Sequence, residues 1–153
     1  MVESLVDLQT SPTVFFVPGL PVGQPRQRHT KTGHNYTPAT HPVQAFRYAV
    51  AQAAREAACG KTLPLYPTGA VTLEVALYFP RPKALQWKTK PWTPLRHTKK
   101  PDLDNVLKAL KDALKGITWA DDAQVARLAA EKWICSAEQD PGVVVWMHGL
   151  GEE

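Results

Sequence analysis

Four aspartates occur close together in the second half of the chain, one pair before a helical stretch and one pair after it. Asp102 and Asp104 stand in KPDLDNVLKALKDAL, residues 100–114, and Asp121 and Asp122 follow in TWADDAQV, residues 118–125. Carboxylates gathered in one place repel one another unless a cation neutralises them. Oxygen ligands without histidine or cysteine suit Mg²⁺ or Mn²⁺. If the fold brings the two pairs together, they predict a site for a divalent metal ion.

A helix from about Asp104 to Lys115 must position the first pair. Its apolar residues fall on one side, while Lys108 and Lys111 share the opposite side with Asp104 and Lys115. A strand is predicted over residues 125–134, directly after the second pair. We expect this strand to enter the sheet beside the start of the helix. That arrangement would bring the second pair of aspartates close to the first.

Simpler explanations compete for these acids. Asp104 can act as a helix N-cap, with Lys108 four residues on as an ordinary surface partner. Adjacent acids after a helix often form only a polar turn. An EF-hand loop starting at Asp102 is excluded, because Leu107 and Ala113 stand where that loop needs glycine and glutamate. The cap does not explain Asp102, so the metal site accounts for more of the pattern.

Two segments that contain cations and no acids predict contact with nucleic acid. The first is a loop over residues 18–38, rich in proline and glycine, with Arg26, Arg28 and Lys31. The second is a proline-broken loop with Arg81, Lys83, Lys88, Lys90, Arg96, Lys99 and Lys100. Together with Lys111, these side chains would neutralise backbone phosphates and make binding sensitive to salt. Trp87 and Trp92 either pack within their own loop or stack on bases at a branch, and Lys132 is a minor further candidate.

Length and composition predict one globular domain. The 153 residues are 44% apolar and carry a net charge of +4, which is compatible with nucleic acid without establishing it. Cys59 and Cys135 have no paired spacing, so neither a disulfide framework nor a zinc site is predicted. Residues 1–12 are expected to be a flexible leader and residues 13–150 the single domain. The sequence shows no signal peptide or membrane span, so a cytoplasmic protein is expected.

The pattern of elements predicts an α+β fold in which a small mixed β-sheet carries two main helices. The expected order is strand, helix, strand, helix, strand, strand. Strands are predicted over residues 13–17, 71–79, 125–134 and 143–148, and helices over residues 42–58 and 104–115. The strict alternation of residues 71–79 is typical of a half-buried strand. Thr40 is the expected N-cap of the first helix.

The carboxylate motifs resemble those of the RusA family of Holliday junction resolvases, found in bacteria and their prophages. The family is known for DxDN, a lysine four residues after the second aspartate, and a downstream DD. In this chain these are Asp102, Asp104 and Asn105, then Lys108, then Asp121 and Asp122. The resemblance is strong over residues 100–125 and looser elsewhere, where QPRQR at residues 24–28 also fits.

The resemblance implies a Mg²⁺-dependent endonuclease, with Mn²⁺ able to substitute, that resolves four-way DNA junctions by paired symmetric nicks in recombination and repair. By similarity the essential acids are Asp102, Asp104 and Asp122, with Asp121 as an adjacent metal ligand or helper and Lys108 as the essential lysine. A homodimer is expected, because two symmetric nicks need two sites and the chain contains one cluster and no repeat. The implied location is a bacterial or phage-infected cell. The alternatives are a catalytically inactive module that binds branched DNA, a general metal-dependent nuclease, and a structural protein whose acids only cap and turn.

Overall fold

The computed structural model describes residues 11–151, so residues 1–10 of the predicted leader lie outside the described range. Its elements follow in the order β1 (Thr13–Pro18), β2 (Arg28–His29), β3 (Asn35–Tyr36), α2 (Pro42–Ala58), β4 (Val71–Phe79), η1 (Lys83–Leu85), β5 (Leu95–Arg96), α3 (Leu103–Leu114), η2 (Asp122–Gln124), β6 (Val125–Ile134) and β7 (Gly142–Gly149). The six long elements confirm the predicted order of strands and helices. The short elements all lie in segments predicted as loops or turns.

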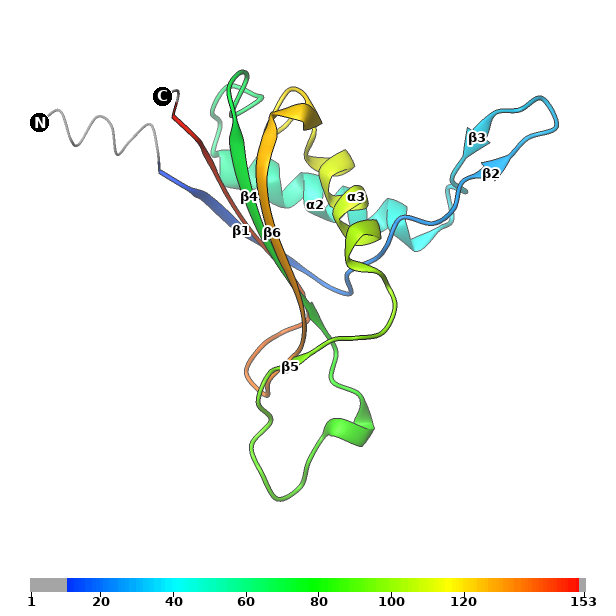
Figure 1. Ribbon diagram of the computed structural model, residues 1–153, viewed down its shortest axis with the longest axis vertical. Coiled ribbons are helices and arrows are strands. Elements are labelled where there is room, and N and C mark those ends of the chain that lie inside the picture. The colour runs from blue at the N-terminus through cyan, green and yellow to red at the C-terminus, as the bar shows by residue number, and fades with distance from the viewer. Residues whose placement is uncertain (1–10, 152–153) are drawn as a thin grey trace, which may run out of the picture.

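The main sheet has five strands in the order β1-β7-β4-β6-β5, and β2 and β3 form a separate hairpin. β4 lies at its centre, parallel to β6 and antiparallel to β7, which confirms the predicted mixed sheet and the α+β class. Both helices pack on one face of this sheet (Figure 1). The alternation in β4 reflects the predicted half-burial of the strand. Leu73, Val75 and Leu77 are buried, while Glu74, between the first two, is exposed.

α2 places an apolar stripe against the sheet. Val43, Phe46 and Val50 are buried at helical spacing. The prediction of Thr40 as N-cap is wrong, because His41 holds that position and its Nδ1 accepts a hydrogen bond from the Val43 amide at 3.0 Å. Proline is favoured as the first residue of a helix, and here Pro42 fixes the cap one residue later than predicted. Within residues 11–151, no helix is long and apolar enough to cross a bilayer.

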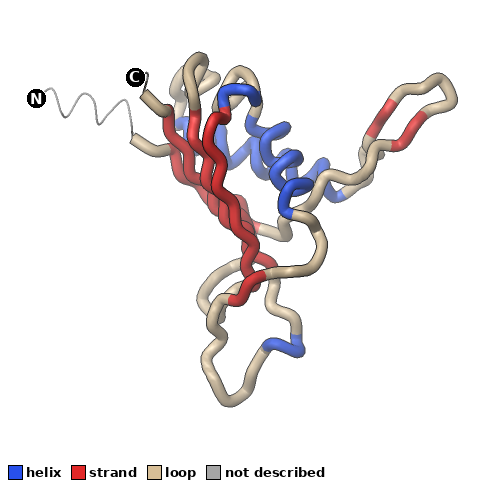
Figure 2. Tube along the Cα trace, in the orientation of Figure 1, coloured by secondary structure: helices blue, strands red, loops and turns tan. Residues whose placement is uncertain are grey.

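α3 connects two parallel strands, and this connection fixes its direction. β4 and β6 run the same way, so the chain must return between them, and α3 makes that return. The start of α3 is reached through β5, which pairs with the carboxyl end of β6 at Trp133 and Ile134. The end of α3 leads through η2 into the amino end of β6, as the strand and loop traces of Figure 2 show. The end of α3 therefore lies near the amino end of β6, while its start faces the carboxyl end of β6, to which residues 97–102 connect it (Figure 1).

Candidate active site

A cleft of about 910 Å³ opens beside the first turns of α3. One wall comes from the segment after β1 and from the β2–β3 hairpin, and the other from α3 and the residues before it. Its charged lining consists of Arg26, Lys100, Asp102, Lys108 and Asp112. The fold thus brings together four residues singled out in the sequence, from segments that lie far apart along the chain. The whole charged lining comprises three cations and two carboxylates, so the cleft offers cations to an anionic ligand beside a carboxylate that could hold a metal ion.

Gly23 and Gln24 fix the first wall of the cleft against the second. The Gln24 amide donates to the Asn105 carbonyl at 2.9 Å. A Cβ atom on Gly23 would stand 3.1 Å from the Cβ of Pro101 and 3.4 Å from that of Asn105. Glycine therefore permits the close approach of the two walls, because a larger residue would have to push the start of α3 away.

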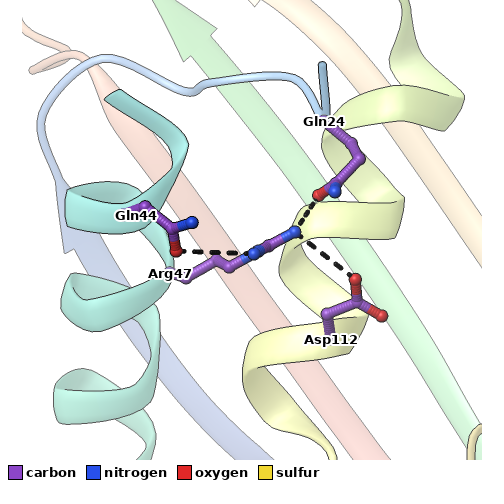
Figure 3. A network of polar contacts seen from close by, with 4 residues as sticks. All are labelled: Gln24, Gln44, Arg47 and Asp112. Carbon is purple, nitrogen blue, oxygen red and sulfur yellow. Dashed lines mark hydrogen bonds and ion pairs between the residues drawn. The ribbon is translucent and has the colours of Figure 1, made fainter. Parts of the chain in front are cut away.

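Arg47 of α2 ties the same wall to the middle of α3, as Figure 3 shows. Its guanidinium donates to the side-chain oxygens of Gln24 and, at 3.5 Å, of Gln44. It also forms an ion pair with Asp112, with 3.6 Å between Nη2 and Oδ2. The Nε atom of Arg47 is buried without a hydrogen-bond partner. No sequence pattern indicates the position of Arg47, because it lies on a helix remote from every motif.

Asp102 and Lys108 line the cleft, and neither charged group is paired with another residue of the described chain. Asp102 is the N-cap residue of α3, yet its side chain makes no capping hydrogen bond. Lys108 is exposed and makes no ion pair with any residue of the described chain. The simple explanation in which Lys108 pairs with Asp104 is therefore wrong for this structure. Both side chains remain available to a ligand.

The second pair of aspartates is held in the turn that follows α3. Asp121 caps η2 by accepting a hydrogen bond from the Ala123 amide at 2.9 Å. Asp122 accepts one from the indole Nε1 of Trp119 at 2.8 Å, and Trp119 is fully buried. The polar-turn explanation thus holds for the local structure of both residues. The other carboxylate oxygen of each has no such partner among the described residues and is free to meet a cation.

The prediction that the two pairs lie together within one chain is wrong. β6 begins beside the end of α3, where the Thr118 amide donates to the Leu114 carbonyl, and not beside its start. A helix of 12 residues spans about 18 Å, at about 1.5 Å per residue, so the length of α3 separates the pairs. In residues 11–151, no group of three or more acidic, histidine or cysteine side chains could hold a metal ion.

The residues at the start of α3 still fit a magnesium ion. Asp102 and Asp104 offer only oxygen ligands, which suit Mg²⁺. Mg²⁺ often binds through one or two carboxylates, keeping several waters and taking further ligands from substrate phosphates. One chain therefore offers two carboxylates to such an ion, of which Asp102 lines the cleft and Asp104 is exposed beside it on α3.

A family model described as Endodeoxyribonuclease RusA matches residues 18–147. This chain belongs to the RusA family. It is also similar to a protein of Bacillus subtilis (strain 168) named "Uncharacterized protein YqaN", with 36% identity over 86 residues. That similarity covers 53% of this chain and 58% of the relative, so the chain spans little more than half of the relative's length. The RusA match lies inside the predicted domain of residues 13–150 and includes the cleft, both pairs of aspartates and both basic segments.

In this RusA-family chain, one cation of the second basic segment serves the loop itself. Arg81 is buried, and its guanidinium donates to the carbonyls of Leu85 and Thr93 at 2.6 Å and of Cys135 at 3.1 Å. It also lies 4.4 Å from the ring centre of Trp87. The prediction that Arg81 contacts DNA is wrong, because these contacts use its donors inside the protein. The role of Arg81 is to hold together a loop that has little regular structure.

Trp87 and Trp92 pack within the same loop. The Trp92 indole donates to the Trp87 carbonyl at 2.9 Å, and the Lys90 ammonium lies 3.9 Å from the Trp87 ring centre. Both tryptophans are half-buried. Their contacts favour the interpretation in which they stabilise their own loop.

The remaining predicted DNA-binding cations lie mostly at the surface of two projections. Arg26, Arg28 and Lys31 are exposed in and beside the β2–β3 hairpin, and Lys83, Lys88, Lys90, Lys99 and Lys100 are exposed between β4 and α3. Arg96 is also exposed, but it lies in β5, where it pairs with Glu131 at 3.4 Å and stacks on the Trp133 ring. Figure 1 shows the hairpin and the loop between β4 and α3 extending from the body in different directions, with the start of α3 between them. Lys111 is half-buried on α3 and does not line the cleft. Contact of these cations with DNA stays a prediction.

Lys132, the minor candidate, anchors the segment that leads into α3. Its ammonium donates to the Lys99 carbonyl at 2.5 Å. His97 in the same segment stacks on Phe79, with 4.1 Å between ring centres. Burial lowers the pKa of His97, and the positive charges of Lys132 and Lys99 lower it further, so its imidazole is neutral at neutral pH.

Several cleft residues could not be found by sequence reasoning. His29, Asn35 and Asp112 line the cleft, although none stands in a motif of metal-ligand spacing. His29 in particular has no second ligand at a suitable spacing in the sequence. Gln24 and Gln27 also line the cleft, and they stand in QPRQR at residues 24–28, a stretch that only the family resemblance connects with function.

Proposed function

We propose that this chain is a Mg²⁺-dependent endonuclease that resolves four-way DNA junctions. The observation that carries the proposal is the cleft at the start of α3, which joins Asp102 to Lys108 and Arg26 in a member of the RusA family. A DNA phosphate in this cleft would meet cations on both walls. The two basic projections would extend the contact to the neighbouring duplex arms.

Each of the four aspartates has a proposed role, although only Asp102 of the four lines the cleft. Asp102 and Asp104 hold Mg²⁺, or Mn²⁺ in its place, with Asp122 as the third essential acid and Asp121 as an adjacent ligand. When bound, the ion supplies Lewis-acid stabilisation of charge that develops on the phosphate. Lys108 places its ammonium against the scissile phosphate and opposes the same charge. Arg26 and Lys100 orient the DNA backbone through the neighbouring phosphates.

The free edge of β6 offers a way for the second pair of aspartates to join this site. β4 pairs with β6 along one edge, but β5 covers the other edge only at Trp133 and Ile134. From Val125 to Glu131 no strand of residues 11–151 pairs with that outer edge. An unpaired edge is suited to the addition of another strand. We propose that β6 of a second copy pairs there, antiparallel, about a two-fold axis.

The sequence of β6 is complementary to itself in this arrangement. With Ala129 on the two-fold axis, Arg127 of each chain stands opposite Glu131 of the other. Leu128, which is 46% exposed, then stands opposite Ala130 of the second copy. Glu131 already pairs with Arg96 of its own chain at 3.4 Å, so pairing would give Arg127 an acidic partner, add a second cation to Glu131 and cover an exposed apolar side chain.

The same pairing unites the two pairs of aspartates. It brings the carboxyl end of one β6 to the amino end of the other, because antiparallel strands lie head to tail. Asp102 and Asp104 of one copy then face the end of the dimer sheet at which Asp121 and Asp122 of the partner precede β6. The dimer has two such sites related by the two-fold axis, as two symmetric nicks require.

Cleavage of a synthetic four-way junction tests the proposed function. With Mg²⁺ we expect two nicks at symmetric positions in opposite strands, and none when EDTA removes the ion. A linear duplex of the same sequence should be cut at least tenfold more slowly. Binding of the junction without cleavage would favour an inactive DNA-binding module, and equal cutting of both substrates would favour a general nuclease.

Reversal of one charge on β6 tests the proposed dimer. Arg127→Glu places like charges opposite each other twice in the interface, so we expect the dissociation constant of the dimer to rise on the order of tenfold or more. Combining Arg127→Glu with Glu131→Arg should restore the dimer, since the charges are again complementary. Sedimentation velocity measures both effects. Lys61→Glu, an exposed change outside the interface, serves as the matched control.

A further inference from the structure

The wall of the cleft contains an ion pair whose partners are not the expected ones. Lys108 and Asp112 are four residues apart on α3, and both line the cleft. Side chains at this spacing face each other on a helix, with Cβ atoms about 5–6 Å apart, so Lys108 and Asp112 are within reach of an ion pair. In the structure Asp112 instead pairs with Arg47 of α2, and Lys108 has no ion-pair partner in residues 11–151.

We propose that Arg47 is a positioning residue that keeps Asp112 away from Lys108, so that the Lys108 ammonium stays free for a phosphate of the substrate. The inference rests on the proposed function, because it concerns the same cleft. Arg47 has the geometry for this task. Its guanidinium fork reaches Gln24 and Asp112 from one Nη atom and Gln44 from the other.

The surroundings of Arg47 fix the direction of its side chain. Its side chain is 23% exposed, whereas that of Asp112 is 55% exposed. The more exposed partner is therefore the carboxylate, and the guanidinium that it meets is already bound to two glutamine oxygens. The buried Nε atom of Arg47 has no acceptor, so this placement is maintained by the contacts of the two Nη atoms.

Removal of Arg47 would let Asp112 turn to a remaining cation. Two lysines of α3 are neighbours of Asp112 at helical spacing, Lys108 four residues before it and Lys115 three residues after it, and of these only Lys108 lines the cleft with Asp112. A Lys108 that is paired with Asp112 offers a weaker positive charge to a phosphate. The loss should therefore depend on the charge of Asp112 and not only on the absence of Arg47.

The test uses the full-length chain, a four-way junction and no divalent metal, so that binding is measured without cleavage. Arg47→Ala should weaken binding three- to tenfold. It should also reduce the slope of log Kd against log salt by about one, because neutralising a single phosphate contributes about 0.9 to that slope. Arg47→Ala combined with Asp112→Asn should recover both the affinity and the slope. Arg55→Ala, an exposed change on the same helix, is the control.

A second readout does not depend on DNA. NMR detection of the Lys108 ammonium should show a changed ¹⁵N–¹H signal in Arg47→Ala, which returns towards wild type when Asp112→Asn is added. If Arg47→Ala does not fold, Arg47→Lys keeps a cation without the fork and should show a smaller change of the same kind. No recovery on adding Asp112→Asn, in either readout, would overturn the inference. A wild-type chain that does not bind the junction would defeat the proposed function, while the NMR result would still decide the role of Arg47.

Discussion

Asp102→Asn is expected to abolish cleavage of the four-way junction and to leave binding intact. Asparagine has the size of aspartate but lacks the negative charge that would hold a divalent ion. Ion stabilisation of the phosphate is worth several kcal/mol, so the rate should fall about 100-fold or more. Binding in the absence of metal should stay the same or tighten, because one negative charge leaves a cleft that accepts phosphate. Single-turnover cleavage and fluorescence anisotropy measure the two effects.

In this fold, the effect of Asp102→Asn on metal binding can be separated from an effect on stability. The Asp102 side chain makes no capping hydrogen bond to α3, so its loss should change stability little. Glu138→Gln removes one charge from an exposed position in the turn before β7 and serves as the matched control. Near wild-type cleavage by Asp102→Asn with Mg²⁺ would show that the first pair does not hold the ion.

A mixed dimer of two inactive chains is expected to regain activity at one site. If each site combines the first pair of one chain with the second pair of the other, Asp102→Asn and Asp122→Asn homodimers are both inactive. The mixed dimer of these two chains contains one site with both defects and one site with none. On a plasmid with a cruciform, wild type should give linear product, and the mixed dimer should give nicked circles. Separate tags on the two chains allow its purification.

Two further mixed dimers make the result decisive. A chain with Asp102→Asn mixed with a chain with Asp104→Asn should stay inactive, because each site then contains one defect. A chain that carries both Asp102→Asn and Asp122→Asn, mixed with wild type, should also be inactive if the sites are shared. Sites built within single chains predict the reverse for two mixtures: no recovery when Asp102→Asn is mixed with Asp122→Asn, and one active site when the double variant is mixed with wild type.

The positions of the long elements could be predicted from the sequence, because local patterns determine them. Residues 42–58, 71–79 and 125–134 were predicted with the same bounds that the structure has. Alternation in β4 and the alanine-rich stripe of α2 reflect burial on one face, and such periodicity is visible in a single chain. The carboxylates could be proposed as metal ligands from their types and spacing, whereas the role proposed for Lys108 came from the resemblance to the RusA family.

The spatial relation of these residues was decided only by the tertiary structure. Whether the second pair meets the first depends on the direction of α3 between parallel strands, and a helical pattern carries no information on direction relative to a sheet. Arg81 shows the same limit of sequence reasoning. The sequence does not distinguish an arginine that contacts DNA from one that donates to the Leu85, Thr93 and Cys135 carbonyls inside its own loop. Arg47 reaches Asp112 only because α2 and α3 pack side by side. Contacts between elements distant in the chain depend on how their buried faces pack together, and that packing is a property of the whole fold.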